Sequence, residues 1–289
     1  TQRTAIEVRD GAQSGSAQQG NNRTQNESAE SRANRTIEKD DLLLRLELSS
    51  KSVYKGEPVR VRRENIAITG YGTFNGNGDW WRPLKKSKMA PSQWKKHLKE
   101  KGGVVTENDI WYPDSASILA QSYCLDQNVP VITDDSLWQI VKSFLRPVML
   151  HFVGCKNILL EGVTFENSPA WNLHPMCCEN LILRDLNVRN PWYSQNGDGV
   201  DVESCKNVVI SRCSFDVGDD AICMKSGKDK PGRDRGIPTE NVVVDDCVVY
   251  HGHGGFVCGS EMSGGIKNVQ VSNNLYIGTD VGLRFKSTR

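Results

Sequence analysis

The stretch "KNVVISRCSFDVGDDAICMKS", residues 206–226, contains two short apolar strands in succession and decides the fold. Its first unit, "KNVVI", is a charged residue, an asparagine and a run of branched aliphatic residues. The same unit recurs as "ENIAI", "KNILL", "ENLIL", "ENVVV" and "KNVQV", with its asparagine at positions 65, 157, 180, 241 and 268. From Asn157 onward the asparagines are 23, 27, 34 and 27 residues apart. This period, without amphipathic helices between the units, indicates the coils of a parallel β-helix. Stacked coils predict a ladder in which each buried asparagine amide bonds the coils above and below.

The second strand of each coil also repeats without gaps. It reads "WNLHPMC" (171–177), "DGVDVES" (198–204), "DAICMKS" (220–226), "GGFVCGS" (254–260) and "VGLRFKS" (281–287). Alternation along a strand predicts an apolar inner face formed by Val200, Val202, Ile222, Met224, Phe256, Cys258, Leu283 and Phe285. The outer face is predicted to expose a dense charged surface formed by His174, Asp201, Glu203, Lys225, Arg284 and Lys286.

The repeat divides the chain into an all-β domain at 63–289, interrupted by an insertion at 80–147, and an atypical segment at 1–62. Residues 1–62 are rich in Gln, Asn, Ser, Glu and Arg, a composition typical of a poorly structured segment. The insertion is expected to be partly helical, with one helix that ends at Gly102 and another that ends before Pro147. The insertion could cover the substrate as a lid or could cover an open end of the coil.

The composition excludes several function classes. Lys and Arg number 36 against 35 Asp and Glu, so no net field indicates a nucleic-acid or membrane partner. No apolar run approaches the ~18 residues of a membrane span. The nine cysteines include no C-x-x-C pair, which argues against a structural zinc site. Those that share a position in the repeat (Cys155, Cys178 and Cys205; Cys213 and Cys247) are predicted to be stacked core thiols. We expect a monomer.

Acidic residues meet where the chain turns into the second strand. Asp198 and Asp220 share an offset on neighbouring coils, so they should lie one strand spacing apart, ~4.8 Å. Asp219 and His253 share the preceding offset. Clustered carboxylates cannot all ionise easily, so one pKa should rise and leave an acid beside a base, as glycoside hydrolysis requires. A calcium site and a solvated turn remain open alternatives at this point.

The motifs "NGDG", "GDD", "GHG" and "RFK" follow one another on successive coils. In that order they resemble the four signatures of glycoside hydrolase family 28, the polygalacturonases, and the resemblance covers 64–79 and 149–289. It implies a right-handed parallel β-helix and cofactor-free, inverting hydrolysis of α-1,4 links between galacturonate units.

The resemblance also assigns roles to residues of this chain. Asp219 would be the general acid, Asp198 and Asp220 would position and deprotonate the water, and His253 would tune the acid. Substrate binding is expected from Arg284 and Lys286, which would hold the galacturonate carboxylate, and from His174, Asp201 and Lys225.

Two departures from the family pattern are visible. Gly197 replaces the commoner threonine in "NGDG", which should loosen the turn. The chain stops at Arg289, whereas the family continues through further coils that include a substrate-contacting tyrosine, so we expect the final apolar coil to be exposed.

The insertion favours action from a chain end (exo action). Alternatives are a rhamnogalacturonan hydrolase, a calcium-dependent pectate lyase and a non-catalytic β-helical carbohydrate-binding protein. The expected substrate is a pectic polysaccharide or an oligogalacturonide, which implies a secreted or periplasmic setting.

Overall fold

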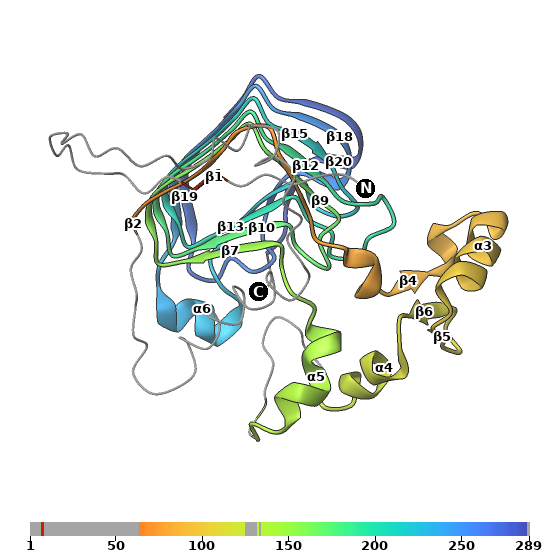
Figure 1. Cartoon of the computed structure of the whole chain (residues 1–289). Coiled ribbons are helices and arrows are strands. Elements are labelled where there is room, and N and C mark those ends of the chain that lie inside the picture. The colour runs from red at the N-terminus through yellow and green to blue at the C-terminus, as the bar shows by residue number, and fades with distance from the viewer. Residues whose placement is uncertain (1–6, 9–63, 125–131, 133, 288–289) are drawn as a thin grey trace, which may run out of the picture.

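The computed structural model describes residues 7–8, 64–124, 132 and 134–287. Within them the chain winds into a right-handed parallel β-helix, whose coils stack as nested bends in Figure 1. The predicted fold class is confirmed. The prediction for residues 1–62 lies outside the described residues, apart from a short strand at Glu7–Val8. Among the described helices none is long and apolar enough to cross a membrane.

Each coil contributes strands to stacked parallel sheets. The first sheet contains β2 (Glu64–Thr69), β8 (Lys156–Glu161), β11 (Glu179–Arg184), β14 (Lys206–Ser211), β17 (Thr239–Asp245) and β19 (Ile266–Ser272), with β1 (Glu7–Val8) antiparallel at its edge. The second run contains β3 (Thr73–Asn75), β9 (Thr164–Glu166), β12 (Asn187–Arg189) and β15 (Ser214–Asp216). The third run contains β7 (Leu150–Val153), β10 (Leu173–Met176), β13 (Val200–Glu203) and β16 (Ile222–Lys225). The long strands β18 (Val248–Cys258) and β20 (Leu275–Phe285) join the second run to the third.

The core is built from equivalent side chains that stack coil upon coil. Val200 pairs with Ile222, which pairs with Phe256, and all three are buried. Leu283 continues this row but is 57% exposed, because no further described coil covers it. The predicted inner face is therefore confirmed, and its last members, Leu283 and Phe285, form an apolar end surface.

The predicted asparagine ladder is present. The side-chain amides of Asn157, Asn180, Asn207, Asn241 and Asn268 each donate to the carbonyl oxygen of the preceding asparagine, at 2.8–3.2 Å. The prediction that these amides are buried is wrong, since every member is exposed at a corner of the coil. Each has a φ between 53° and 60°, a left-handed conformation that asparagine tolerates better than most residues. The corner geometry therefore explains the residue type, and the ladder adds the bonds between coils.

The repeat-phased cysteines are buried and stacked, as predicted. The backbone N–H of Cys178 donates to Sγ of Cys205 at 3.4 Å. Cys213 and Cys247 are likewise buried in the core. These thiols therefore belong to the packing of the coils.

The insertion is partly helical, and both predicted helices are present. Its elements are η1 (Gly78–Trp80), β4 (Leu84–Lys85), η2 (Lys86–Lys88), α3 (Pro91–Lys101), β5 (Val104–Val105), β6 (Ile110–Tyr112), α4 (Ser115–Gln121) and α5 (Leu137–Leu145). The helix α4 and the small antiparallel sheet of β4, β5 and β6 were not predicted. A further helix, α6 (Asp229–Arg235), lies in the turn after β16.

Two buried arginines attach the insertion to the turns that precede the third run of strands. Arg82 donates to the Ser168 carbonyl oxygen at 2.6 Å. Arg146 donates to the Gln195 carbonyl oxygen at 2.9 Å and to Oδ1 of Asn196 at 2.7 Å. Arg146 thus holds its end of the insertion beside the segment that leads into Asp198, and Arg82 holds the other end at the equivalent turn of the preceding coil.

Candidate active site

Three carboxylates converge where the chain enters β13 and β16. Asp198 precedes β13, while Asp219 and Asp220 precede β16. One oxygen from each lies within 4.8 Å of the others. The backbone N–H of Gly199 donates to the Asp220 carbonyl oxygen at 3.0 Å, which sets the two coils in the predicted register. The predicted convergence is observed, and the chemical roles remain a prediction.

Gly197 and Gly218 allow this turn to pack closely. A Cβ built on Gly197 would lie 1.8 Å from Oγ of Ser194, and one on Gly218 would lie 2.5 Å from the Pro191 carbonyl oxygen. The expectation that Gly197 loosens the turn is wrong, because the missing side chain leaves the space that Ser194 occupies. The tight packing holds Asp198 in place.

Burial and mutual repulsion perturb two of the acids. The pKa of Asp198 is raised well above its ordinary value, first by burial and then by Asp201 and Asp219. The pKa of Asp219 is raised by burial and by Asp220, although the Asn196 N–H that donates to its Oδ2 at 3.1 Å opposes the shift. At least one proton is therefore held in the cluster at a pH where an isolated aspartate has lost it.

Two buried carboxylate oxygens of the cluster are unsatisfied. Oδ1 of Asp198 and Oδ1 of Asp220 have no hydrogen-bond partner among the described residues. Buried polar atoms in proteins are nearly always hydrogen-bonded, so such orphans call for a water molecule or a substrate group.

Arg284 of β20 and Lys286, which directly follows β20, complete the cluster. The ammonium of Lys286 donates to Oδ2 of Asp220, and Arg284 contacts Nε2 of His253. The three carboxylates alone could approach a divalent cation. The Lys286 ammonium already supplies positive charge to Asp220, so a cation would have to compete with it.

His253 lies beside Asp219 through the backbone, as predicted. Its N–H donates to the Asp219 carbonyl oxygen at 2.8 Å. The imidazole makes its hydrogen bonds elsewhere, since Nδ1 lies 2.8 Å from Oδ2 of Asp280. Asp280 was not predicted, although it shares the offset of Asp219 and His253 in the strand alignment. Extending that alignment by one residue would have found it.

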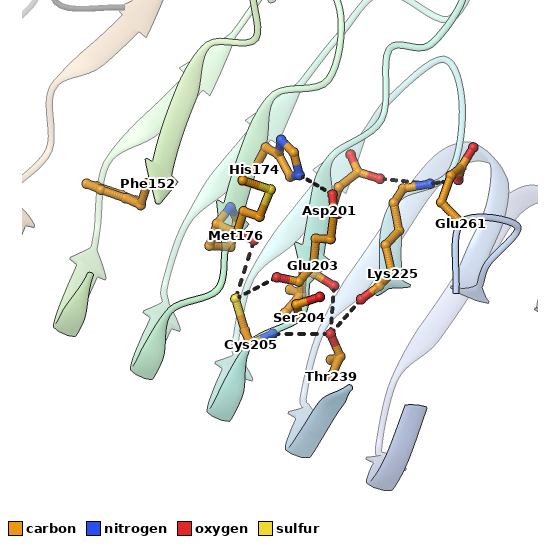
Figure 2. A network of polar contacts seen from close by, with 12 residues as sticks. Phe152, His174, Met176, Asp201, Glu203, Ser204, Cys205, Lys225, Thr239 and Glu261 are labelled. Carbon is orange, nitrogen blue, oxygen red and sulfur yellow. Dashed lines mark hydrogen bonds and ion pairs between the residues drawn. The ribbon is translucent and has the colours of Figure 1, made fainter. Parts of the chain in front are cut away.

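The predicted exposed charged surface on the third run is wrong for four of its six members. His174, Asp201, Glu203 and Lys225 are buried, and Figure 2 shows them paired with one another and with residues of the following turns. Lys225 Nζ lies 2.7 Å from Oε2 of Glu261 and 3.4 Å from Oδ1 of Asp201. Nε2 of His174 lies 2.9 Å from Oε2 of Glu203, and Oε1 of Glu203 accepts from Arg235 of α6. The alternation of side chains along the strand correctly predicted that these residues point away from the core. It does not predict which chain segments cover them.

Asp201 shares its cationic partner, Lys225, with a second carboxylate, Glu261. Glu261 is the nearer carboxylate to Lys225, and the pKa of Glu261 is lowered, chiefly because Lys225 outweighs its burial. Burial raises the pKa of Asp201 to about 8, even though Lys225 opposes the shift. Asp201 is therefore the carboxyl of the network that keeps its proton.

Comparison with known proteins gives a consistent result. The family model described as glycosyl hydrolases family 28 matches residues 141–289. A probable polygalacturonase from Vitis vinifera is 32% identical over 146 residues, which are 50% of this chain and 30% of that protein. An exo-poly-alpha-D-galacturonosidase from Dickeya chrysanthemi is 26% identical over 224 residues, which are 78% of this chain and 35% of that protein.

Solved structures show the same fold. A hyperthermoactive exopolygalacturonase from Thermotoga maritima has 35% sequence identity and a TM-score of 0.58, covering 78% of this chain and 47% of that one. A family 28 exopolygalacturonase from Yersinia enterocolitica, at 22% identity, also has a TM-score of 0.58, covering 80% of this chain and 39% of that one. The chain spans about a third of the length of the two curated relatives.

Proposed function

Because the chain belongs to glycosyl hydrolase family 28, we propose that it hydrolyses α-1,4 links between galacturonate units of polygalacturonate or its oligomers. The observation that carries the proposal is the cluster of three carboxylates with Lys286 and Arg284 beside it. Paired carboxylates supply the acid and base of glycoside hydrolysis. Nearby cations suit a polymer that bears a carboxylate on every unit.

The three acids are suited to different tasks. Asp219 is the proposed general acid, since its raised pKa lets it keep a proton for the leaving oxygen. Asp220, which is bonded to the Lys286 ammonium, is the proposed base that takes a proton from water. Asp198 is buried and would hold that water through its unpaired Oδ1.

Asp219→Asn tests the assignment. General acid catalysis contributes about 10²–10⁴-fold, so kcat for reducing-sugar release from polygalacturonate should fall at least about 10²-fold. Asp216→Asn is a matched control, because Asp216 pairs with His251 on the exposed face of β15 and β18. Unchanged activity of Asp219→Asn would sink the proposal.

We propose that the reaction inverts the anomeric configuration. The three carboxylates are closer together than the ~6.5–9.5 Å typical of inverting enzymes and nearer the ~5–5.5 Å of retaining ones. The proposal therefore rests on the resemblance to family 28, and the attacking water would lie at the edge of the cluster. Proton NMR of the first product decides this point. An α-linked substrate should yield the β anomer first, and early appearance of the α anomer would establish retention.

We propose exo action in a secreted or periplasmic setting, where a pectic polymer is found. In support, the insertion is anchored through Arg82 and Arg146 to the turns beside the carboxylates, where it could close one end of a binding groove. The sizes of the first products test this. Only monomer or dimer is expected, whereas a ladder of oligomers would indicate endo action.

The rival functions give different outcomes in the same assay. A calcium-dependent lyase would lose activity in chelator and release unsaturated products. We expect full activity in chelator and saturated products. A binding protein would retain oligogalacturonate without turnover, and a rhamnogalacturonan hydrolase would prefer a rhamnose-containing polymer.

A further inference from the structure

Three ionisable residues occupy equivalent positions on successive coils, directly before the aligned strand segments 220–226, 254–260 and 281–287. These are Asp219, His253 and Asp280. The N–H of His253 donates to the Asp219 carbonyl oxygen at 2.8 Å. On the other side, Gly252 pairs with Thr279 and Gly254 with Val281, which places Asp280 directly beside His253.

Both ring nitrogens of His253 are engaged by groups with fixed hydrogen-bonding roles. Nδ1 lies 2.8 Å from Oδ2 of Asp280, and Nε2 contacts Nη1 of Arg284. A carboxylate only accepts and a guanidinium only donates. Both contacts are satisfied when the ring carries its proton on Nδ1 and its lone pair on Nε2. The opposite tautomer and the imidazolium would each set an N–H against the guanidinium.

We propose that Asp280 is a positioning residue that fixes the Nδ1–H tautomer of His253 and, through Nε2, orients Arg284 toward the substrate carboxylate. The orienting part of this inference rests on the proposed function, because it requires Arg284 to bind a uronate. Carboxylates fix histidine tautomers in the same way at metal sites.

The other charged groups near His253 are bonded to other partners. Asp219 faces the ring from the turn before β16, and its own Oδ2 accepts from the Asn196 backbone. Lys286 is bonded to Asp220, and the neighbouring His251 is paired with Asp216. Asp280 is thus the described carboxylate within hydrogen-bond distance of Nδ1.

Substitution of the Asp280 side chain should leave the fold intact. Its side chain is 71% exposed, and exposed ion pairs contribute little to folding. A change in substrate binding would therefore not be caused by unfolding.

The tautomer can be measured without substrate. Nitrogen-15 NMR of histidine-labelled protein near pH 8, with His253 assigned through His253→Gln, should show a protonated Nδ1 and an unprotonated Nε2. Asp280→Ala should give a mixture of tautomers. A protonated Nε2 in the unaltered protein, or an unchanged spectrum in Asp280→Ala, would overturn the proposal.

Kinetics on oligogalacturonate separate positioning from structure. Asp280→Ala should raise KM at least about tenfold and change kcat less than about threefold, whereas Asp280→Asn, which keeps an acceptor oxygen, should stay within about twofold in both. Asp216→Ala is the matched control, since it breaks the comparable exposed pair with His251 (2.9 Å) on β15 and β18.

A KM for Asp280→Ala equal to that of Asp216→Ala would refute the role in orienting Arg284. Absence of turnover in the unaltered protein would instead count against the proposed function. The NMR result would still decide whether Asp280 fixes the tautomer.

Discussion

Adjacent residues in the Asp219–Asp220 dipeptide face different neighbours, and this separates their chemistry. Asp219 stacks on His253 through the backbone, while Asp220 pairs with Lys286, which directly follows β20. The dipeptide lies in a turn, so its two side chains diverge toward different coils. One residue is left as a carboxyl with a raised pKa and the other as an ion-paired carboxylate.

The ion pair between Lys286 and Asp220 should matter for catalysis. In Lys286→Met, the buried Asp220 loses its partner and the substrate loses a cation, so kcat/KM on polygalacturonate should fall at least about tenfold. Lys267→Met is a matched control, because Lys267 pairs with Glu240 on the exposed sheet of β17 and β19. Equal kcat/KM values in the two variants would contradict the assignment.

Asp201 should make folding stability depend on pH. Its folded pKa of about 8 exceeds the ordinary value of 3.8, so the folded state binds a proton that the unfolded state has released. Its contribution therefore falls as pH rises from about 4 to about 8, on the order of 1 kcal/mol per pH unit. Asp201→Asn should lose less stability between pH 5 and pH 8 than the unaltered protein in urea titrations. Parallel pH profiles would show that Asp201 is ionised when folded.

At the scale of the element, each coil corner combines a backbone requirement with a hydrogen bond. Asn180 has φ 59°, donates to Asn157 at 2.8 Å and accepts from Asn207 at 3.0 Å. The conformation favours asparagine or glycine, and the ladder favours asparagine alone.

Two substitutions separate these contributions. Asn180→Ala should lower the free energy of unfolding by about 1–2 kcal/mol, because alanine is strained at this φ and the ladder bonds are lost. Asn180→Gly should cost less, since glycine adopts the conformation freely. Denaturant unfolding measures both, and a glycine variant less stable than the alanine variant would contradict this ranking.

Across the whole molecule, stability should depend on where a side chain lies along the stack of coils. Ile222 and Leu283 occupy equivalent positions in one row, but Ile222 is fully buried whereas Leu283 lies on the apolar end surface. The same substitution should therefore have different consequences at the two positions.

Ile222→Ala should cost about 2–5 kcal/mol and Leu283→Ala less than about 1 kcal/mol. The free energy of unfolding of each variant tests this, with both made in the same background. A cost for Leu283→Ala that approaches that of Ile222→Ala would show that the end surface is covered in solution.

The repeat made most of the fold predictable. Asparagine corners and alternating apolar residues recur at every coil, so two strands of each coil, their register and the meeting of Asp198, Asp219 and Asp220 could be derived by alignment. The short strands of the second run were not predicted. The two insertion helices followed from their local boundaries at Gly102 and Pro147. Helix α4 and the small antiparallel sheet have no repeat to reveal them.

The sequence by itself determined which backbone positions stack, because stacking follows from periodicity along the chain. Only the tertiary structure decided what each polar side chain contacts. Asp280 beside His253 and Glu261 beside Lys225 depend on side-chain directions and on turns of irregular length. The burial of Asp201 and Lys225 depends on the chain segments that cover the strand. Periodicity specifies a position in the coil, whereas pairing and burial depend on groups brought together from separate turns in three dimensions.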